Sequence, residues 1–230
     1  MRFLRRVRLA LRRPVMFAQE RILRLADRAA DRRICGRSLV KYEPSIDRDD
    51  AAGVGGTGSS ATHYLILERI FSHVTLTPED VFLDVGCGKG RVLAFLLKER
   101  APCRLCGVEH SEVSVRTAQA WTRRYPQVTV IPGDALQLDY DPYTVLFLNR
   151  PFLPVTFLGF VERLEATVTH PVTLLYWVDQ QSGRLLKDRP GWTLCFREKL
   201  EKIRGLRIAY SPQGSSVWTF DPARREGAEP

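Results

Sequence analysis

Residues 81–90 read VFLDVGCGKG, an apolar run that passes directly into a loop with glycine at every second position. The first half is typical of a buried β-strand, and a helical pattern begins immediately after the loop, over Arg91–Lys98. Closely spaced glycines let the chain turn sharply and let a ligand approach the backbone without a Cβ in the way. The stretch therefore predicts a strand, a ligand-binding loop and a helix.

Strand-like and helix-like segments continue to alternate through the rest of the chain. Helices are predicted at 112–124, capped by Ser111, and near 156–168, and strands near 105–109, 128–131, 145–148, 172–178, 193–197 and 217–220. Short, fully apolar strands that alternate with helices indicate a parallel sheet covered on both faces. We therefore expect an α/β fold, with a doubly wound, mostly parallel seven-stranded sheet and an antiparallel C-terminal strand.

The composition fits one large domain with appendages. The chain has 230 residues, of which 44% are hydrophobic and 27% charged, which excludes the disordered and fibrous classes. It contains no apolar run long enough to span a membrane. Five irregularly placed cysteines do not suggest a disulfide framework, so we expect reduced thiols and a cytoplasmic location.

Positive charge is concentrated in an N-terminal arm. The net charge is +9, but residues 1–41 hold 13 Lys/Arg and 3 acids, which leaves 22 basic against 23 acidic residues in the body. We expect the arm to be a basic amphipathic extension made of two helices that are broken at Pro14. One apolar stripe is predicted before this proline, and the second is predicted at Val15, Ala18, Ile22, Leu25, Ala26 and Ala29.

Three other segments complete the predicted organisation. Residues 42–60 are polar and Gly-rich and indicate a loop, and Ser60 at its end would cap a helix over about 61–73. Residues 61–222 would form the ligand-binding domain, and the tail 223–230 is expected to be disordered.

Polar residues follow the next three strands of the predicted sheet. Glu109 ends the second strand, 25 residues after Asp84, where it would accept hydrogen bonds from a ribose diol. Asp134 follows the third strand and would accept from an exocyclic amine, and Asn149 begins the segment NRPF after the fourth strand. Since ligands of open α/β sheets bind outside the carboxyl ends of the strands, these residues define one candidate site.

This series resembles the class I S-adenosylmethionine-dependent methyltransferases over about residues 60–180. The stretch VFLDVGCGKG matches the glycine-rich first motif of that family, and the resemblance implies a Rossmann-like fold with S-adenosylmethionine as cofactor. In the family the glycine loop holds the methionine end, the acid of the second strand binds the ribose, and the acid after the third strand contacts adenine. The residues that the resemblance assigns to cofactor binding are Asp84, Gly86, Cys87, Gly88, Gly90, Glu109, His110, Asp134 and Ala135.

The segment after the fourth strand bears on the methyl acceptor, and the resemblance makes Asn149, Arg150 and Phe152 its catalytic residues. Amino-methylating families carry Asp/Asn-Pro-Pro-aromatic here, and their Asn accepts hydrogen bonds from the target amine. This chain has Arg150 instead of the first proline, and arginine donates only, so it would clamp an anionic group or lie on the rim. The segment is also similar to one in histone lysine methyltransferases that lack a SET domain. The expected function is methyl transfer to an unidentified acceptor, with an amine or protein lysine favoured over a hydroxyl.

Other cofactors fit the sequence less well. A nicotinamide fingerprint needs G-x-G-x-x-G after a strand; the chain has that pattern only at Gly53–Gly58, which does not follow an apolar strand. In several methyltransferase families the corresponding segment folds over the cofactor, which would bring Thr62 or Tyr64 to it. Cys103, Cys106 and His110 do not supply the four converging ligands of a closed metal site, so no metal is predicted.

The partner of the arm is left open between two interpretations of equal weight. Its helices either pack on the domain with solvated arginines or lie on an anionic membrane surface through residues 1–34, which would make a cytoplasmic protein peripheral to a membrane. Nucleic acid ranks behind both, because aromatic residues are sparse in the arm. The main alternative to an enzyme is a non-catalytic cofactor- or nucleotide-binding protein that acts through this arm at a membrane or nucleic-acid surface. The oligomeric state does not follow from the sequence.

Overall fold

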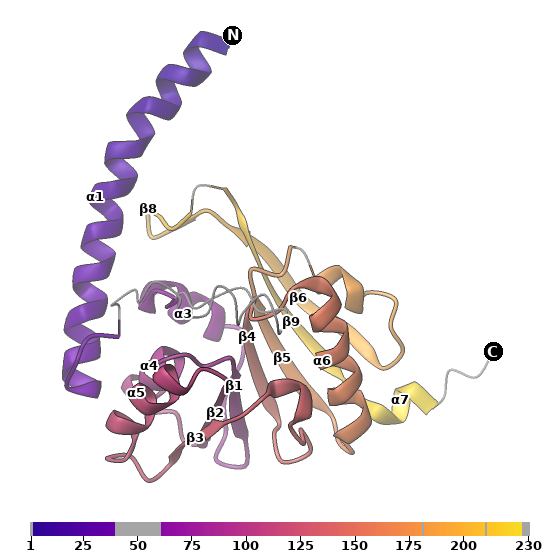
Figure 1. Cartoon of the computed structure of the whole chain (residues 1–230). Helices are drawn as coiled ribbons and strands as arrows, with labels where there is room; N and C mark the ends of the chain where they lie inside the picture. The colour runs from indigo at the N-terminus through magenta and orange to yellow at the C-terminus, as the bar shows by residue number, and fades with distance from the viewer. Residues whose placement is uncertain (1, 40–60, 181, 210, 227–230) are drawn as a thin grey trace.

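The computed structural model describes residues 2–39, 61–180, 182–209 and 211–226 (Figure 1). The predicted Gly-rich loop at 42–60 and the predicted cap Ser60 lie outside the described residues.

A seven-stranded sheet forms the centre of the molecule, with the strand order β3-β2-β1-β4-β5-β9-β6. Strands β1 to β5 are parallel to one another; β9 is antiparallel to both β5 and β6, so it is the one reversed strand of this sheet. The predicted mostly parallel sheet with an antiparallel C-terminal strand is confirmed. The strands are β1 (Val81–Val85), β2 (Arg104–Glu109), β3 (Val128–Pro132), β4 (Val145–Asn149), β5 (Val172–Trp177), β6 (Trp192–Leu200) and β9 (Gln213–Phe220).

Helices cover both faces of the sheet (Figure 1). One core joins the sheet to α3 (Tyr64–Phe71), α4 (Arg91–Lys98) and α5 (Glu112–Thr122), and the other joins it to α6 (Pro154–Thr167). Strand β1 is buried along its whole length and contributes Phe82 to the first core and Leu83 to the second. The apolar run of residues 81–85 is therefore a central strand, buried on both faces as a parallel strand requires.

The arm is a single helix, α1 (Arg2–Cys35), and the predicted break at Pro14 was wrong. A proline inside a helix removes one backbone hydrogen bond and crowds the preceding turn, at a cost of about 3 kcal/mol. It does not prevent hydrogen bonding in the turns on either side, so this helix continues through it.

The face of α1 that packs on the domain also differs from the predicted stripe. Ile22 and Leu25 are 58% and 61% exposed, whereas Leu23 and the two acids Asp27 and Asp31 are buried. Helix α1 thus turns its aspartates inward and its second apolar stripe outward. The inward face combines the buried Leu23, and Ala30 and Ile34 packed on the core, with the two aspartates, so the more continuous apolar stripe did not indicate which side packs on the domain.

The charge that holds α1 belongs to Arg91, the first residue of α4. Its Nη1 lies 2.9 Å from Asp27 Oδ2 and its Nη2 lies 2.7 Å from Asp31 Oδ2, and all three side chains are at most 4% exposed. Asp31 also accepts hydrogen bonds from the Tyr64 hydroxyl and from the backbone N–H of Leu39. Buried charges are tolerated when each is paired and hydrogen-bonded, as they are here.

Two smaller elements lie beyond the sheet. A hairpin of β7 (Lys202–Ile203) and β8 (Leu206–Arg207) reaches α1, where the backbone N–H of Arg207 donates to Gln19 at 3.2 Å (Figure 1). The tail 223–230 was predicted to be disordered; its first residues instead form α7 (Pro222–Glu226), and residues 227–230 lie outside the described residues. Pro222 fits the first position of a helix, and the Arg225 side chain donates to the carbonyl of Glu165, which ties α7 to α6.

We predict that Asp31→Ala lowers the free energy of unfolding by about 3 kcal/mol, because it removes one partner of a buried charge pair. The measurement is urea denaturation followed by circular dichroism. Arg32→Ala, at the next and exposed position of α1, is the matched control and is expected to stay within about 0.5 kcal/mol of the wild type. Equal stability of the two variants would contradict the assigned role of Asp31.

Candidate functional site

The glycine loop sits at the carboxyl end of β1 and is held by β2. The backbone N–H groups of Gly86 and Cys87 donate to the carbonyl of Val108 at 2.9 and 3.0 Å. Gly86, Gly88 and Gly90 have φ angles of +74°, +54° and +85°. These values are strained for residues with a Cβ, so the glycines are required for the turn from β1 into α4.

The Cys87 side chain faces the protein interior. A Cβ placed on Gly107 of β2 would lie 2.7 Å from Cys87 Sγ, so the loop packs directly on the strand below it. Burial, followed by the charges of Asp84 and Glu109, raises the pKa of the Cys87 thiol well above its ordinary value. The side chain is a packing group, and a cofactor contact from Cys87 would come from its backbone.

Asp84 supplies a buried carboxylate beneath this loop. It is 3% exposed, and its Oδ2 atom has no hydrogen-bond partner among the described residues. Burial, and then the charge of Glu109, raises the pKa of Asp84 well above its ordinary value. A buried carboxylate oxygen without a donor fits a ligand that brings a cationic or N–H group to it.

Glu109 links the glycine loop to the end of β2. Its Oε2 accepts from the backbone N–H of Gly88 and its Oε1 accepts from that of Ser111, both at 2.8 Å. A carboxylate has about four acceptor positions, so these two bonds fix its orientation and leave capacity for hydroxyl donors. His110, the next residue, is exposed at the surface.

The segment after β3 lies beside Glu109. The backbone N–H of Gly133 donates to the Glu109 carbonyl at 3.0 Å, and Asp134 Oδ1 caps the short helix η1 (Ala135–Gln137) by accepting from Leu136 at 2.9 Å. Ala135 is buried. Since β1, β2 and β3 are neighbours, the structure brings Asp84, Glu109 and Asp134 to one edge of the sheet.

The residues after β4 separate into two groups. The Asn149 amide donates to Thr62 Oγ1 at 2.8 Å, and Arg150 has a φ of +41°, a left-handed conformation that is uncommon for arginine. A Cβ on Gly86 would lie 3.0 Å from Pro151, so this segment closes directly over the glycine loop. Phe152, in contrast, is buried in the core, where its ring packs 5.5 Å from that of Phe160.

Tyr64, suggested as a cofactor contact, lies in the α1 interface instead, together with His63. The Tyr64 hydroxyl donates to Asp31 at 3.1 Å, and His63 lies with Nδ1 2.6 Å from Asp27 Oδ2 and Nε2 3.2 Å from Glu20 Oε2. Thr62, the other suggested contact, instead reaches Asn149. The roles assigned from sequence to the site residues remain predictions.

A second strained turn, which the sequence interpretation missed, lies beside Arg150. Asn149 pairs with Trp177 in the sheet, and the following residue, Val178, has a φ of +61°. Such a conformation is costly for a β-branched side chain, and strain of this kind gathers at functional sites. The next residue, Asp179, is fully buried and pairs with Arg197 at 3.1 Å.

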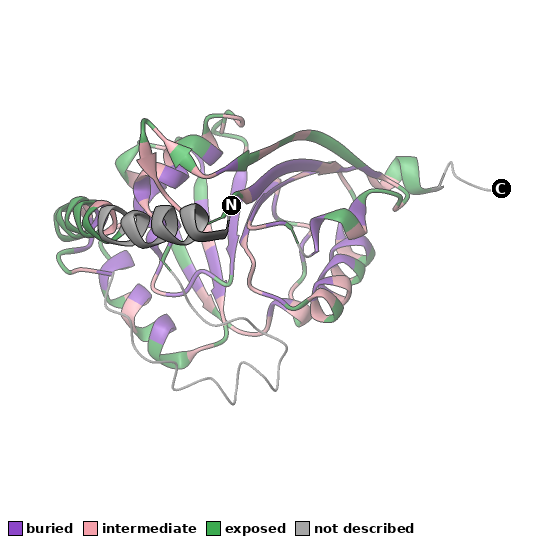
Figure 2. Cartoon of the chain, turned by 90° about the horizontal axis from the view of Figure 1, so that it is seen from above, coloured by how far each residue is buried: buried purple, intermediate pink, exposed green. Residues whose placement is uncertain are grey.

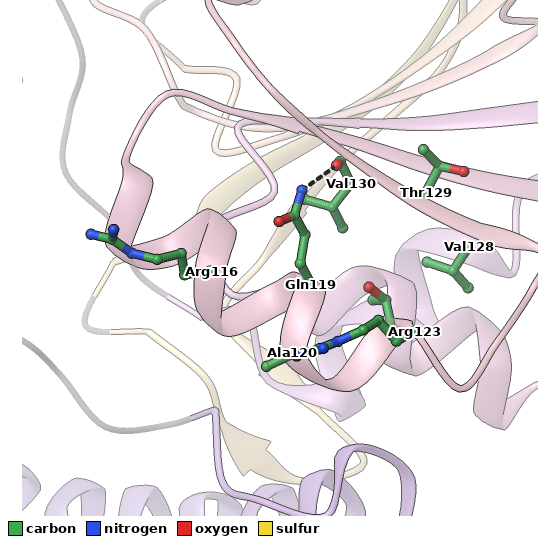
Figure 3. Close-up of a pocket in the computed structure, with 8 residues that line it drawn as sticks. Arg116, Gln119, Ala120, Arg123, Val128, Thr129 and Val130 are labelled. Carbon is green, nitrogen blue, oxygen red and sulfur yellow. Dashed lines mark hydrogen bonds between the residues drawn. The ribbon is translucent and has the colours of Figure 1, made fainter.

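A surface depression elsewhere is separate from this edge of the sheet. It lies between α5 and the first residues of β3, at the opposite end of that strand, and Gln119 there donates to the carbonyl of Val130 at 3.0 Å (Figure 3). Within the described part of the chain, no group of three or more His, Cys, Asp or Glu side chains is placed to hold a metal. No helix of that part is long and apolar enough to cross a bilayer.

The strand order, the single reversed strand and the glycine loop after β1 together define the Rossmann-like fold of the class I S-adenosylmethionine-dependent methyltransferases. Residues 82–154 match a family model described as a methyltransferase domain. The match includes the glycine loop, Glu109, Asp134 and Asn149.

Relatives and solved structures agree with this classification. The chain is 27% identical over 99 residues to a probable ribosomal RNA small subunit methyltransferase A of Methanosarcina barkeri, covering 41% of this chain and 34% of the relative. It is 25% identical over 125 residues to trans-aconitate 2-methyltransferase of Yersinia pestis, covering 52% and 47%. The chain thus spans less than half the length of these curated relatives. An RNA methyltransferase from Salinibacter ruber, solved with S-adenosylhomocysteine, shares the fold with a TM-score of 0.51 and 17% identity, covering 70% of this chain and 93% of that one.

We predict that His63 makes the stability of the protein pH-dependent. Burial lowers the pKa of His63, but hydrogen bonds and charges from Asp27 and Glu20 outweigh it and raise the pKa above 6.5. The stabilisation that protonated His63 gives to the folded protein is fully present below the unfolded-state pKa of this residue. It is lost as pH rises through the higher folded-state pKa. The difference in unfolding free energy between wild type and His63→Gln, measured by urea titration, should therefore be largest below about pH 6.5. A difference that grows with rising pH would contradict this assignment.

Proposed function

We propose that this chain is an S-adenosylmethionine-dependent methyltransferase. The observation that carries the proposal is the buried Asp84 carboxylate, which has an oxygen without a donor among the described residues and lies beneath a loop of three left-handed glycines. A cationic amino-acid end fits this position, because it brings both charge and N–H donors to a desolvated carboxylate. Glu109 and Asp134 continue along the same edge of the sheet, in the order in which the cofactor's ribose and adenine would follow.

Each residue has a distinct task in this proposal. Asp84 and the loop backbone hold the methionine end, the oriented Glu109 carboxylate accepts from the ribose hydroxyls, and Asp134 accepts from the adenine amine. Gly86 is exposed, and its lack of a side chain makes room for Pro151, which packs against the loop. When bound, the cofactor supplies an electrophilic methyl group on a sulfonium centre.

The acceptor in our proposal is an amine. Asn149 ends β4, two residues before Pro151, which packs on the glycine loop. Its amide nitrogen donates to Thr62, which fixes the direction of its carbonyl oxygen. A carbonyl oxygen held in this way accepts a hydrogen bond from an amine N–H and aims the nitrogen lone pair. Catalysis would then consist of positioning and desolvation, for which no metal is required.

A second candidate acceptor is a carboxylate. Arg150 stands next to Asn149 in a strained conformation, and an arginine at this position favours a substrate with an anionic group. One similar protein is named for methylation of trans-aconitate. Other similar proteins are named for RNA methylation. The amine of a nucleobase is also an amine acceptor, so it belongs to the first candidate and is not a third one.

We predict that the purified protein binds S-adenosylhomocysteine with micromolar affinity by isothermal titration calorimetry and does not bind NAD. Glu109→Ala should weaken binding about tenfold or more, since a hydrogen bond to a charged group contributes about 1.5–3 kcal/mol. Glu112→Ala, an exposed acid three residues further on, is the matched control and should bind as the wild type does. Failure to bind S-adenosylhomocysteine would refute the proposed cofactor.

We also predict that methyl groups transferred from S-adenosylmethionine to fractions of a cell extract remain attached through mild base treatment. Methyl esters hydrolyse under these conditions and methylated amines do not, so the label distinguishes the two candidate acceptors. Base-labile label would favour the carboxylate acceptor. Cofactor binding without transfer to any fraction would support the non-catalytic alternative.

A further inference from the structure

Helix α1 presents an apolar stripe on the side opposite to the domain. Ile22 and Leu25 are 58% and 61% exposed, and the small residues at the same helical spacing, Ala18, Ala26 and Ala29, are exposed as well. Phe17 is 66% exposed and lies beside this stripe, on the side of the arginines. Figure 2 shows α1 at the margin of the molecule, with its described turns mostly exposed. In sequence, apolar residues at the same spacing of three and four continue back to residue 4. Because α1 is one helix through Pro14, the two predicted stripes belong to a single element.

The charges of α1 are sorted between its two sides. Asp27 and Asp31 are buried against Arg91, and Glu20 pairs with Arg24 and His63. The arginines of this region are exposed instead, at Arg21, Arg24, Arg28, Arg32, Arg33 and Arg37. The outward surface therefore combines exposed apolar side chains with a strong excess of positive charge.

We propose that α1 docks the protein on the surface of an anionic lipid membrane. A basic amphipathic helix lies in the plane of the membrane interface, with its apolar side chains at the acyl boundary and its arginines at the anionic headgroups. Arginine stems also extend along such a surface while their guanidinium groups stay in the polar layer. This function is independent of the methyl-transfer reaction.

Charge complementarity selects this occupant over a second copy of the chain. Two α1 helices packed through the same stripe would bring the arginines of both copies together, with the acids of both turned away. Like charges brought together in this way repel each other and would destabilise the pair of helices. RNA would satisfy the arginines, but its phosphate backbone offers no apolar surface to the side chains of Phe17, Ile22 and Leu25.

Docking needs no rearrangement of the domain, because α1 is held to α4 by its inner face. Arg91 follows Gly90 directly and is clamped by Asp27 and Asp31. A helix with its side chains is about 10 Å across. The clamp would therefore hold the glycine loop close to the lipid surface in a fixed orientation.

We predict that the full chain sediments with vesicles of phosphatidylcholine and phosphatidylglycerol and not with phosphatidylcholine alone. Arg21→Gln with Arg28→Gln should weaken binding about tenfold or more, because each basic residue near an anionic leaflet contributes about fivefold. Ile22→Asp with Leu25→Asp should abolish it. The matched control is Arg116→Gln with Arg123→Gln, two exposed arginines of α5 and its C-cap, which should bind like the wild type.

Other outcomes would overturn the proposal. Equal binding to both kinds of vesicle, or loss of binding in the α5 control, would show that α1 does not recognise anionic lipid. Absence of vesicle binding together with binding of single-stranded RNA that survives the Ile22 and Leu25 changes would assign the surface to nucleic acid. A dimer by light scattering that the same changes dissociate would assign it to a second copy. S-adenosylhomocysteine affinity or circular dichroism shows that each variant is folded. The comparison of the two kinds of vesicle uses wild-type protein, so it tests the proposal whether or not a variant folds.

Discussion

The arrangement of the molecule depends on the ion pairs of the buried Arg91 guanidinium. A charge taken out of water requires partners, and here both are aspartates of a helix that lies far away in sequence. The requirement fixes the position and rotation of α1, and through Asp27 it also fixes His63 and the start of α3. Arg91 is the first residue after the glycine loop, so the arm and the candidate cofactor site share one electrostatic anchor.

The same anchor reaches the segment at the end of β4. Thr62 lies near Arg91 through its carbonyl and accepts from Asn149 through its hydroxyl. Asn149 in turn precedes Arg150, whose strained backbone adjoins the strained Val178 of the neighbouring strand. A polar path thus connects α1 to the carboxyl ends of β4 and β5, and the rigid sheet beneath keeps those ends in register. Preorganisation of this kind suits a reaction governed by positioning.

Local pattern was enough to predict the central fold. The run VFLDV is β1, the helix after the loop covers Arg91–Lys98 as expected, and Ser111 caps α5. The glycine loop and the acids after β2 and β3 were likewise placed by the order of strands. The rotation of α1 was not predictable, because Asp27 and Asp31 look like solvent-facing acids until their partner 60 residues away is known. The contact between Thr62 and Asn149 was not predictable for the same reason, because the two residues are 87 positions apart in the sequence. The sequence did contain one indication that Arg91 is buried: this arginine starts a helix whose other early residues are apolar.

The reversed strand β9 imposes an order on how the sheet is completed. It follows β6 in sequence but lies between β5 and β6 in space. While the chain emerges from the ribosome, β6 has no partner in the main sheet until β9 has been made, and β5 keeps one edge of unpaired backbone groups during that interval. Exposed edges of this kind are sites of intermolecular strand pairing. Until residues 213–220 leave the ribosome, the edge of β5 is therefore open to such pairing, and β9 covers it.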